Sequence, residues 1–408
     1  MKVGVVSNLF PPEVLGGYEI GCGQVVEGLR ERGVDVQVLT SRRCPKEGRE
    51  YVHNTLSCSI GVRFSKMSRL AKLRFLIWHE RENLRAFRKF LVEVRPDVLY
   101  FWNLSHISRS MLSLARKSCI PCGTFVFDHE LCKVSSDPWL SQFAKVPGNP
   151  ARSVQRVLMA VAAVLIRRPA DLPLEFDFLH YPTRYLKGLL ERSGIRAHRW
   201  CHVPWGVNTE LFHPAESLPQ GKLLYVGQVS DHKGVHLAIE AVGLLKQRNP
   251  EFPLHLTIAG RVASENYERE LVDLVVKYHL EETVAFLGFV DRKNLPALYR
   301  QHSVLLFPSV WEEPMGISIL EAMASGLVVI SSGTGGSAEL FVDCESGLVF
   351  KSKDTQDLAG KLEVLLDNTD RFREIGSQAL AMCVEKFQFS RTLESLQAQL
   401  FEEVGLNS

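Results

Sequence analysis

Two glutamates, Glu313 and Glu321, stand at the ends of the stretch "EPMGISILE". Pro314 and Gly316 favour a loop at the first glutamate, and the apolar, alanine-rich residues after them favour a helix that contains the second. Free backbone amides at 315–317 would then bind an anionic group such as phosphate. An ionised carboxylate can accept two hydrogen bonds from a vicinal diol. A ligand with phosphate in the middle and a sugar at each end fits this pattern, and a nucleotide-diphosphate sugar is such a ligand.

Each glutamate also has an ordinary interpretation. Glu313 alone could be a solvated loop acid, and Glu321 alone could be an acid on the surface of a helix. The hypothesis of a binding site therefore depends on the whole arrangement of acids, loop and helix start.

The elements that must position these residues follow a strand–helix pattern that occurs twice. In the first half a β-branched run at Val3–Ser7 predicts a buried strand, and a glycine-bearing loop separates it from a helix. After Val203 the pattern restarts. The expected strands lie at 3–7, 34–41, 98–102 and 123–127, then at 222–226, 254–261, 284–290, 303–309 and 327–331; the expected helices lie at 20–32, 235–248, 267–278, 295–302, 317–325 and 390–403.

Strands that alternate with helices predict an α/β fold with parallel sheets covered on both faces. A chain of 408 residues is too long for one ordinary core. We therefore expect two doubly wound, Rossmann-like domains that face a cleft, at 1–204 and 205–385, and a crossover helix at 386–408 that returns to the first domain. Loops that follow the strands, including Gly16–Gly17 and 227–234, should carry the ligands because ligands collect at the carboxyl ends of parallel strands.

Five motifs resemble those of the retaining GT-B glycosyltransferases of family four, the glycosyl transferases group 1. They are "EEPMGISILEAMASGLVVI", "GTGGSAEL", "GVNTELF", "VGQVSDHKG" and "PPEVLGGYE". The resemblance is specific between about residues 203 and 350 and looser in the first 200 residues. It implies a hexosyltransferase that moves a sugar with retention from a nucleotide-diphosphate sugar to a glycan, a lipid or a small molecule.

The same resemblance assigns roles to individual residues. It implies that Glu321 holds the ribose diol, that Glu313 holds the donor sugar, and that Lys233 neutralises the leaving diphosphate. Such charge stabilisation of a departing group is commonly the largest catalytic term. The expected catalytic residues are Glu313, Lys233, Asp128 and His129, and the expected donor-binding residues are Gly16, Gly17, Gly227, Gln228, Lys233, Arg261, Met315, Gly316, Ile317 and Glu321.

One of these assignments departs from the family pattern, and another leaves two residues open. The family has an arginine five residues before the lysine of "VGQVSDHKG", where this chain has Gln228. Arg261 follows a neighbouring strand, and we expect it to supply part of the missing charge; its ordinary interpretation is a solvated loop residue. The family also places a polar residue after a central strand of the first domain, and either Asp128 or His129 could be that residue.

We expect no metal cofactor. The chain has no Asp-x-Asp motif with which a divalent metal would hold the diphosphate. Cys119, Cys122, His129 and Cys132 have spacings that could suggest zinc. However, "SCIPCGTFVF" predicts a buried strand that would separate the first two cysteines from the other two residues, so structural roles are favoured. The nine cysteines are scattered along the chain, as in proteins of reducing compartments.

Charge and hydropathy limit the partners. A formal net charge of +2 argues against a nucleic-acid-binding protein. The N-terminal apolar run is too short for a signal peptide, and no apolar stretch is long enough to span a bilayer, so we expect a cytoplasmic protein. Two basic segments, 61–95 and 151–168, could instead contact the inner face of an anionic membrane. The alternative for both is a core helix with a solvated basic face.

Two other functions are compatible with these motifs. One is another GT-B enzyme of nucleotide sugars, such as an epimerase, although the spacing of the glutamates and "GVNTELF" favour the transferase. The other is a non-catalytic nucleotide-sugar-binding protein, which Gln228 would favour. Assays of donor hydrolysis and of transfer would separate them.

Overall fold

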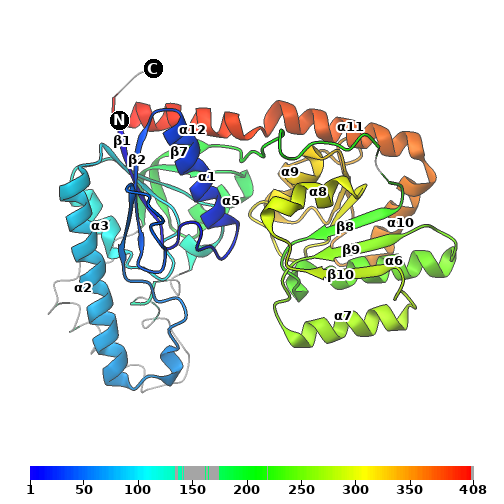
Figure 1. The fold of residues 1–408 in the computed structure, drawn as a ribbon, viewed down its shortest axis with the longest axis horizontal. Helices are drawn as coiled ribbons and strands as arrows, with labels where there is room; N and C mark the ends of the chain where they lie inside the picture. Colours follow the sequence, from blue (N-terminus) through cyan, green and yellow to red (C-terminus); the bar gives the residue numbers. More distant parts are fainter. Residues whose placement is uncertain are drawn as a thin grey trace. The chain divides into compact units, whose positions relative to one another are not determined.

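The computed structural model describes residues 1–133, 137–139, 141, 161, 164, 174–217 and 219–405. These residues form two compact units, each built around its own parallel sheet (Figure 1). Unit 1 contains the described residues of Met1–Pro182, Leu186–Val203 and Leu393–Ser408. Unit 2 contains Thr183–Tyr185 and the described residues of Pro204–Thr392.

The sheet of unit 1 has seven described strands in the order β3-β2-β1-β4-β5-β6-β7, all parallel. The strands are β1 (Lys2–Val6), β2 (Asp35–Ser41), β3 (Val52–Leu56), β4 (Val98–Phe101), β5 (Cys122–Phe125), β6 (Glu175–Tyr181) and β7 (Arg196–His202). The helices are α1 (Gly17–Glu31), η1 (Phe64–Lys66), α2 (Arg69–Val94), α3 (Ser110–Lys117), η2 (Glu130–Cys132) and α5 (Arg184–Arg192). Four of these strands were predicted from the sequence, and β3, β6 and β7 were not.

The sheet of unit 2 has the order β10-β9-β8-β11-β12-β13 and is also parallel. Its strands are β8 (Lys222–Val226), β9 (His255–Ala259), β10 (Val284–Gly288), β11 (Val304–Phe307), β12 (Val328–Ser331) and β13 (Leu348–Val349). Its helices are η5 (Asp231–Lys233), α6 (Val235–Arg248), α7 (Glu265–Lys277), η6 (Arg292–Asn294), α8 (Leu295–Arg300), α9 (Ile317–Ala324), η7 (Gly335–Glu339), α10 (Thr355–Asp367) and α11 (Thr369–Lys386). The last helix, α12 (Phe389–Glu403), begins in unit 2, and its residues from Leu393 on belong to unit 1.

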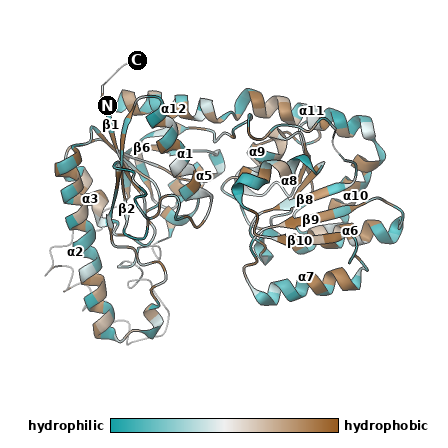
Figure 2. Ribbon diagram, in the orientation of Figure 1, coloured by the Kyte–Doolittle hydropathy of each residue, from teal (hydrophilic) through white to brown (hydrophobic). Residues whose placement is uncertain are grey.

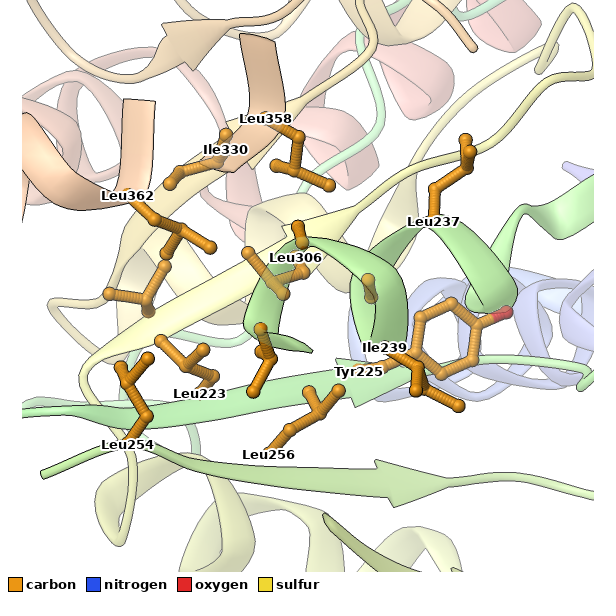
Figure 3. Close-up of a cluster of buried hydrophobic side chains, with 14 of the residues drawn as sticks. Leu223, Tyr225, Leu237, Ile239, Leu254, Leu256, Leu306, Ile330, Leu358 and Leu362 are labelled. Atoms are coloured by element: carbon orange, nitrogen blue, oxygen red, sulfur yellow. The ribbon is translucent and has the colours of Figure 1, made fainter. Parts of the chain in front are cut away.

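Apolar side chains from strands and helices close the core of each unit. In unit 2, Leu223, Leu256 and Ile330 point from the sheet towards Ile239 of α6 and Leu362 of α10, and all five are fully or almost fully buried (Figure 3). In unit 1 the sheet is packed in the same manner against α2 and α3. Burial of this area is the main driving force for each fold.

In both sheets the strand order reverses at the same position. In each, the first strand in sequence, β1 or β8, lies beside the fourth, β4 or β11, because the strand order runs outwards in one direction and then in the other. Ligands of doubly wound sheets bind at the carboxyl ends of the strands at this switch point. The loops after β1 and β4, and those after β8 and β11, are therefore the places where a site is expected.

No described helix is both long enough and apolar enough to cross a membrane. The basic segment 61–95 is placed mainly as α2. Of the segment 151–168 the structure describes only Val161 and Val164, so Arg152, Arg156, Arg167 and Arg168 lie outside the described residues.

Candidate active site

Lys233 and Glu313, which are 80 residues apart in the sequence, form an ion pair at the switch point of unit 2. The Nζ atom of Lys233 lies 2.6 Å from Oε1 of Glu313. Ser309, which follows β11, donates a second hydrogen bond to the same oxygen at 2.7 Å. Both contacts within the described part of the chain reach Oε1, so Oε2 of this buried carboxylate is available to accept a hydrogen bond from a ligand.

The glycine-rich loop after β12 supports Glu313 from the other side. The backbone N–H of Gly336 donates to the carbonyl oxygen of Glu313 at 2.6 Å. A Cβ atom at Gly336 would lie 2.2 Å from the carbonyl oxygen of Pro314, so a side chain there would push the two loops apart. Glu339 at the end of this loop accepts the backbone N–H groups of Arg184 and Tyr185 at 2.8 and 2.7 Å. These contacts fix the loop that carries Glu313.

Helix α9 starts directly after this loop. Gly316 is its N-cap residue, Ile317 is its first residue, and Met315 is buried just before it. The backbone amides of the first turn have no partner inside the helix and carry partial positive charge. The arrangement predicted for 315–317 is therefore present, beside the pair of Lys233 and Glu313.

Glu321 is the fifth residue of α9 and is buried. Its Oε2 accepts a hydrogen bond from the Tyr299 hydroxyl at 3.0 Å, and Nη1 of Arg292 lies 3.3 Å from Oε1. Burial raises the pKa of the Glu321 carboxyl, and Arg292 and Tyr299 oppose part of that rise. Among the described residues, Oε1 accepts no hydrogen bond. A buried carboxylate oxygen without a hydrogen bond is uncommon and is a place where a ligand hydroxyl would be stabilised.

The loops after β8 and β9 are joined by a bridge between Val229 and Val262. The backbone N–H of Gly227 donates to the carbonyl oxygen of Ala259 at 3.0 Å, at the end of β9. The Gln228 side chain is exposed. The guanidinium of Arg261 lies over the ring of Phe289, 5.1 Å from its centroid. Arg261 is thus at the same edge of the sheet as Lys233, and its positive charge is placed on an aromatic face.

In unit 1 the loop after β1 is held by a buried acid. Gly16 is the N-cap residue of α1, and Gly17 is its first residue. Oε2 of Glu19 accepts the backbone N–H groups of Gly16 at 3.0 Å and of Leu15 at 3.2 Å. Oε1 of Glu19 accepts a hydrogen bond at 2.9 Å from Asn103, which follows β4. Glu19 therefore ties together the two loops of the switch point.

Asp128 and His129 follow β5 and lead into η2. Oδ1 of Asp128 accepts the backbone N–H of Glu130 at 2.7 Å, and His129 is the N-cap residue of η2. Burial raises the pKa of Asp128 to about 7, and the nearby acids Glu130 and Glu19 act in the same direction. The Tyr18 hydroxyl donates to the carbonyl oxygen of Phe125 at 2.6 Å. Asp128 is therefore an acid whose ionisation is strongly perturbed.

The structure brings together within unit 2 the predicted residues Lys233, Glu313, Met315, Gly316 and Ile317. It shows in addition five polar residues that hold the predicted ones and that sequence reasoning missed: Glu19, Asn103, Arg292, Tyr299 and Ser309. Glu19 had a local signal, because it stands three residues after the N-cap, where an acid completes a capping box.

The alternative of a zinc site has no support in the geometry. In the described part of the chain no three His, Cys, Asp or Glu side chains are grouped so that they could hold a metal ion. All nine cysteines are described and are free thiols. Cys119 is exposed and Cys122 is buried in β5, which fits the structural interpretation.

Sequence comparisons place the chain in one family. A family model described as "Glycosyl transferases group 1" matches residues 208–382, and one described as "Glycosyltransferase Family 4" matches residues 15–211. The chain therefore belongs to the group 1 glycosyltransferases and is a glycosyltransferase, as the motifs predicted. A D-inositol 3-phosphate glycosyltransferase of Pseudarthrobacter chlorophenolicus is 31% identical over 409 residues, which cover 96% of this chain and 92% of that protein. A glycogen synthase of Mycobacterium tuberculosis is 29% identical over 392 residues, with 90% and 86% covered.

Solved structures agree on the fold. A sucrose-phosphate synthase of Thermosynechococcus elongatus has a TM-score of 0.72 at 19% identity, with 99% of both chains covered. Anabaena Alr3699/HepE in complex with UDP has a TM-score of 0.69 at 17% identity, with 98% of this chain and 100% of that one covered. The predicted GT-B fold, with its two parallel-sheet domains, is confirmed.

The ionisation of Asp128 predicts a pH-dependent stability. Because the folded-state pKa is raised from 3.8 to about 7, stability is present at low pH and is lost as the pH rises from about 4 to about 7. Asp128→Asn keeps an oxygen for the N–H of Glu130 and cannot ionise. We expect the free energy of unfolding of this variant, relative to that of the natural protein, to be higher at pH 8 than at pH 4.5 by on the order of 2 kcal/mol. Urea unfolding at the two pH values measures this difference.

Asp273→Asn, which removes an exposed carboxyl from α7, is the matched control. A difference between Asp128→Asn and the natural protein that is the same at both pH values would show that Asp128 ionises normally.

Proposed function

We propose that this chain transfers a hexosyl group, with retention at the anomeric carbon, from a nucleotide-diphosphate sugar to an acceptor, without a divalent metal. Unit 2 binds the donor, and the acceptor is a glycan, a lipid or a small molecule held by unit 1. The observation that carries the proposal is the ion pair of Lys233 and Glu313 beside the start of α9.

The ion pair supplies what a departing diphosphate needs. Lys233 is about one-quarter exposed, and its ammonium has three N–H donors, of which the contact with Glu313 uses one. The other donors can reach phosphate oxygens, and the free amides at the start of α9 add partial positive charge. Negative charge that develops on the leaving group is thus met by donors already in place, which is the main way in which such sites lower a barrier.

The two glutamates suit the two sugars of such a donor. Oε2 of Glu313 can accept a hydroxyl of the transferred sugar, next to the cation that stabilises the leaving group. Oε1 of Glu321 lacks a hydrogen bond among the described residues, and a ribose hydroxyl would supply it. Since Glu321 must be ionised to accept two hydroxyls, its contacts with Arg292 and Tyr299 keep the carboxylate form accessible despite burial.

The relatives support this assignment by analogy. The sequence relatives include a D-inositol 3-phosphate glycosyltransferase and a glycogen synthase, and Anabaena Alr3699/HepE was solved in complex with UDP-glucose. The retention of configuration rests on the resemblance of the "EPMGISILE" spacing to retaining enzymes. Analysis of the anomeric configuration of the product by NMR tests it directly.

The first prediction for the donor site concerns Lys233 and Glu321. We expect Lys233→Ala and Glu321→Ala each to weaken donor binding or turnover by about 1.5–3 kcal/mol, the scale of a lost charge-assisted hydrogen bond. The donor is first found by a thermal-shift screen of nucleotide-diphosphate sugars, because a ligand that binds only the folded state raises the melting temperature. Lys277→Ala on the exposed face of α7 is the matched control. Turnover close to that of the natural protein in both variants would remove the assignment.

The second prediction concerns the charge that Gln228 does not provide. If Arg261 supplies part of it, Arg261→Ala should reduce turnover about tenfold or more, and Gln228→Arg in the same chain should restore part of the loss. Phe289→Leu is a control for the ring on which Arg261 rests. If Arg261→Ala changes nothing while Gln228→Arg alone raises turnover, Arg261 has no part in donor binding.

The third prediction concerns metals. We expect turnover to be unchanged by an excess of EDTA, because the diphosphate is stabilised by Lys233 and by backbone amides. A loss of most of the activity that added Mg²⁺ or Mn²⁺ reverses would contradict the proposal of a metal-independent enzyme.

A further inference from the structure

The solvent-facing side of α2 carries arginines and large apolar residues in one line. We call this set the outer stripe of α2; it consists of Leu70, Arg74, Trp78, Arg81, Arg85, Arg88 and Val92. Successive members are three or four residues apart, which places them on one face of a helix. All seven are exposed, and for Leu70, Trp78 and Val92 the exposed fractions are 57%, 46% and 70%.

The opposite side of α2 forms core. Leu76, Leu84, Phe87 and Phe90 are buried in unit 1. The outer stripe is thus not needed to hold the helix on the sheet, and Figure 2 shows hydrophilic and hydrophobic residues following one another along α2. An ordinary solvated face carries mostly charged and polar residues. Three large apolar residues exposed along one helix need another explanation.

The charge at the N-terminal end of the outer stripe is of one sign. Between Tyr51 and His79 the sequence contains five Lys or Arg and no Asp or Glu. Within the described part of the chain, Arg74, Arg81 and Arg88 make no ion pair, and Arg85 contacts Glu82 at 3.4 Å at the edge of the stripe. Arg63, Lys66 and Arg69 add exposed cations just before and at the start of α2. The formal net charge of the whole chain is only +2, so this positive charge is concentrated locally.

We propose that the outer stripe of α2 docks flat on an anionic lipid bilayer. From Leu70 to Val92 a helix extends about 33 Å, so this face can lie along a flat surface over its whole length. The guanidinium groups pair with lipid phosphates in bidentate geometry, and anionic headgroups attract each added cation. Trp78 is suited to the headgroup level, with Leu70 and Val92 inserted beside it. This inference goes beyond the proposed function and does not depend on it.

The composition favours a membrane over other polyanions. Leu70 and Val92 have no aromatic face on which a nucleic-acid base could stack, and exposed aliphatic side chains gain nothing from a phosphate backbone. In a bilayer, the same side chains leave water. Interleaved arginine and apolar residues therefore match a surface that is both anionic and apolar beneath.

The test is co-sedimentation of the full chain with vesicles of phosphatidylcholine alone and of phosphatidylcholine with 30% phosphatidylglycerol. We expect binding to the anionic vesicles only, with loss between 50 and 500 mM salt because the screening length becomes shorter. The variant R74Q/R81Q/R85Q/R88Q keeps good helix formers and should bind at least about tenfold more weakly. The control R269Q/K277Q/K351Q/K353Q removes the same charge from exposed positions of unit 2 and should bind as the natural protein does.

A second pair of variants tests the apolar contribution. Trp78→Gln should weaken binding, whereas Val276→Gln on α7, which is 55% exposed, should not. Brominated lipids should quench the tryptophan emission of the natural protein more than that of Trp78→Phe. Far-UV circular dichroism and thermal melting verify that each variant is folded.

Four results would overturn the proposal. They are no binding to anionic vesicles, equal binding to neutral ones, equal binding of the four-arginine variant and its charge-matched control, and binding to single-stranded RNA as tight as to the anionic vesicles. The last result would make the outer stripe a surface for polyanions in general.

Discussion

The ion pair of Lys233 and Glu313 is the contact on which the proposed donor site depends. A buried carboxylate is costly unless a cation or hydrogen-bond donors meet it, and removal of one partner leaves an uncompensated charge. Lys233 comes from the loop after β8, and Ser309 and Glu313 from the loop after β11, while Gly336 from the loop after β12 binds the backbone of Glu313. The side-chain carboxylate and the backbone carbonyl of Glu313 thus connect three loops through hydrogen bonds. Those loops therefore cannot shift independently. The free amides at the start of α9 are therefore held beside the cation.

Both units are doubly wound parallel sheets, but their strands differ in how clearly the sequence marks them. In unit 2 almost every strand is a continuous apolar run flanked by glycine or by a charged loop, so five of the six described strands were predicted and only the two-residue β13 was missed. Helix α6 was predicted at its observed bounds, Val235–Arg248. In unit 1 the strands that were missed are the two edge strands, β3 and β7, and β6 beside β7. The β7 sequence "RAHRWCH" is half-exposed, and β6 begins with Glu175 and Asp177. These segments form strands because they pair with neighbouring strands, and the hydrophobic periodicity of the sequence does not show such pairing.

In the candidate active site, residues that are close in sequence could be predicted, and partners from distant parts of the chain could not. Glu313, Glu321 and the amides between them are close in sequence, and the preference of glycine and proline for loops was enough to place the first acid before α9 and the second inside it. Arg292 could not be predicted, because its role comes only from its position beside Glu321, 29 residues later in the chain. The chemistry of a buried acid requires some partner, yet the sequence offers many arginines and does not say which of them the fold brings near. The same holds for Asn103 and Glu19 in unit 1.

In the proposed donor site, Gln228 affects the positive charge and leaves the arrangement of the other side chains unchanged. Lysine presents its charge at a point and can turn its three donors towards several acceptors, so in the proposed reaction Lys233 would bind a diphosphate without leaving Glu313. An arginine at position 228 would add a fixed fork that binds two phosphate oxygens at once, whereas the glutamine amide offers neutral donors only. The ion pair thus preserves the orientation of the side chains in the proposed site. Glutamine in place of arginine at position 228 lowers the positive charge available there. Since Glu313 already neutralises part of the charge of Lys233, the proposed reaction requires a further cation or the dipole of α9 to carry more of the developing charge than in a site with both basic residues.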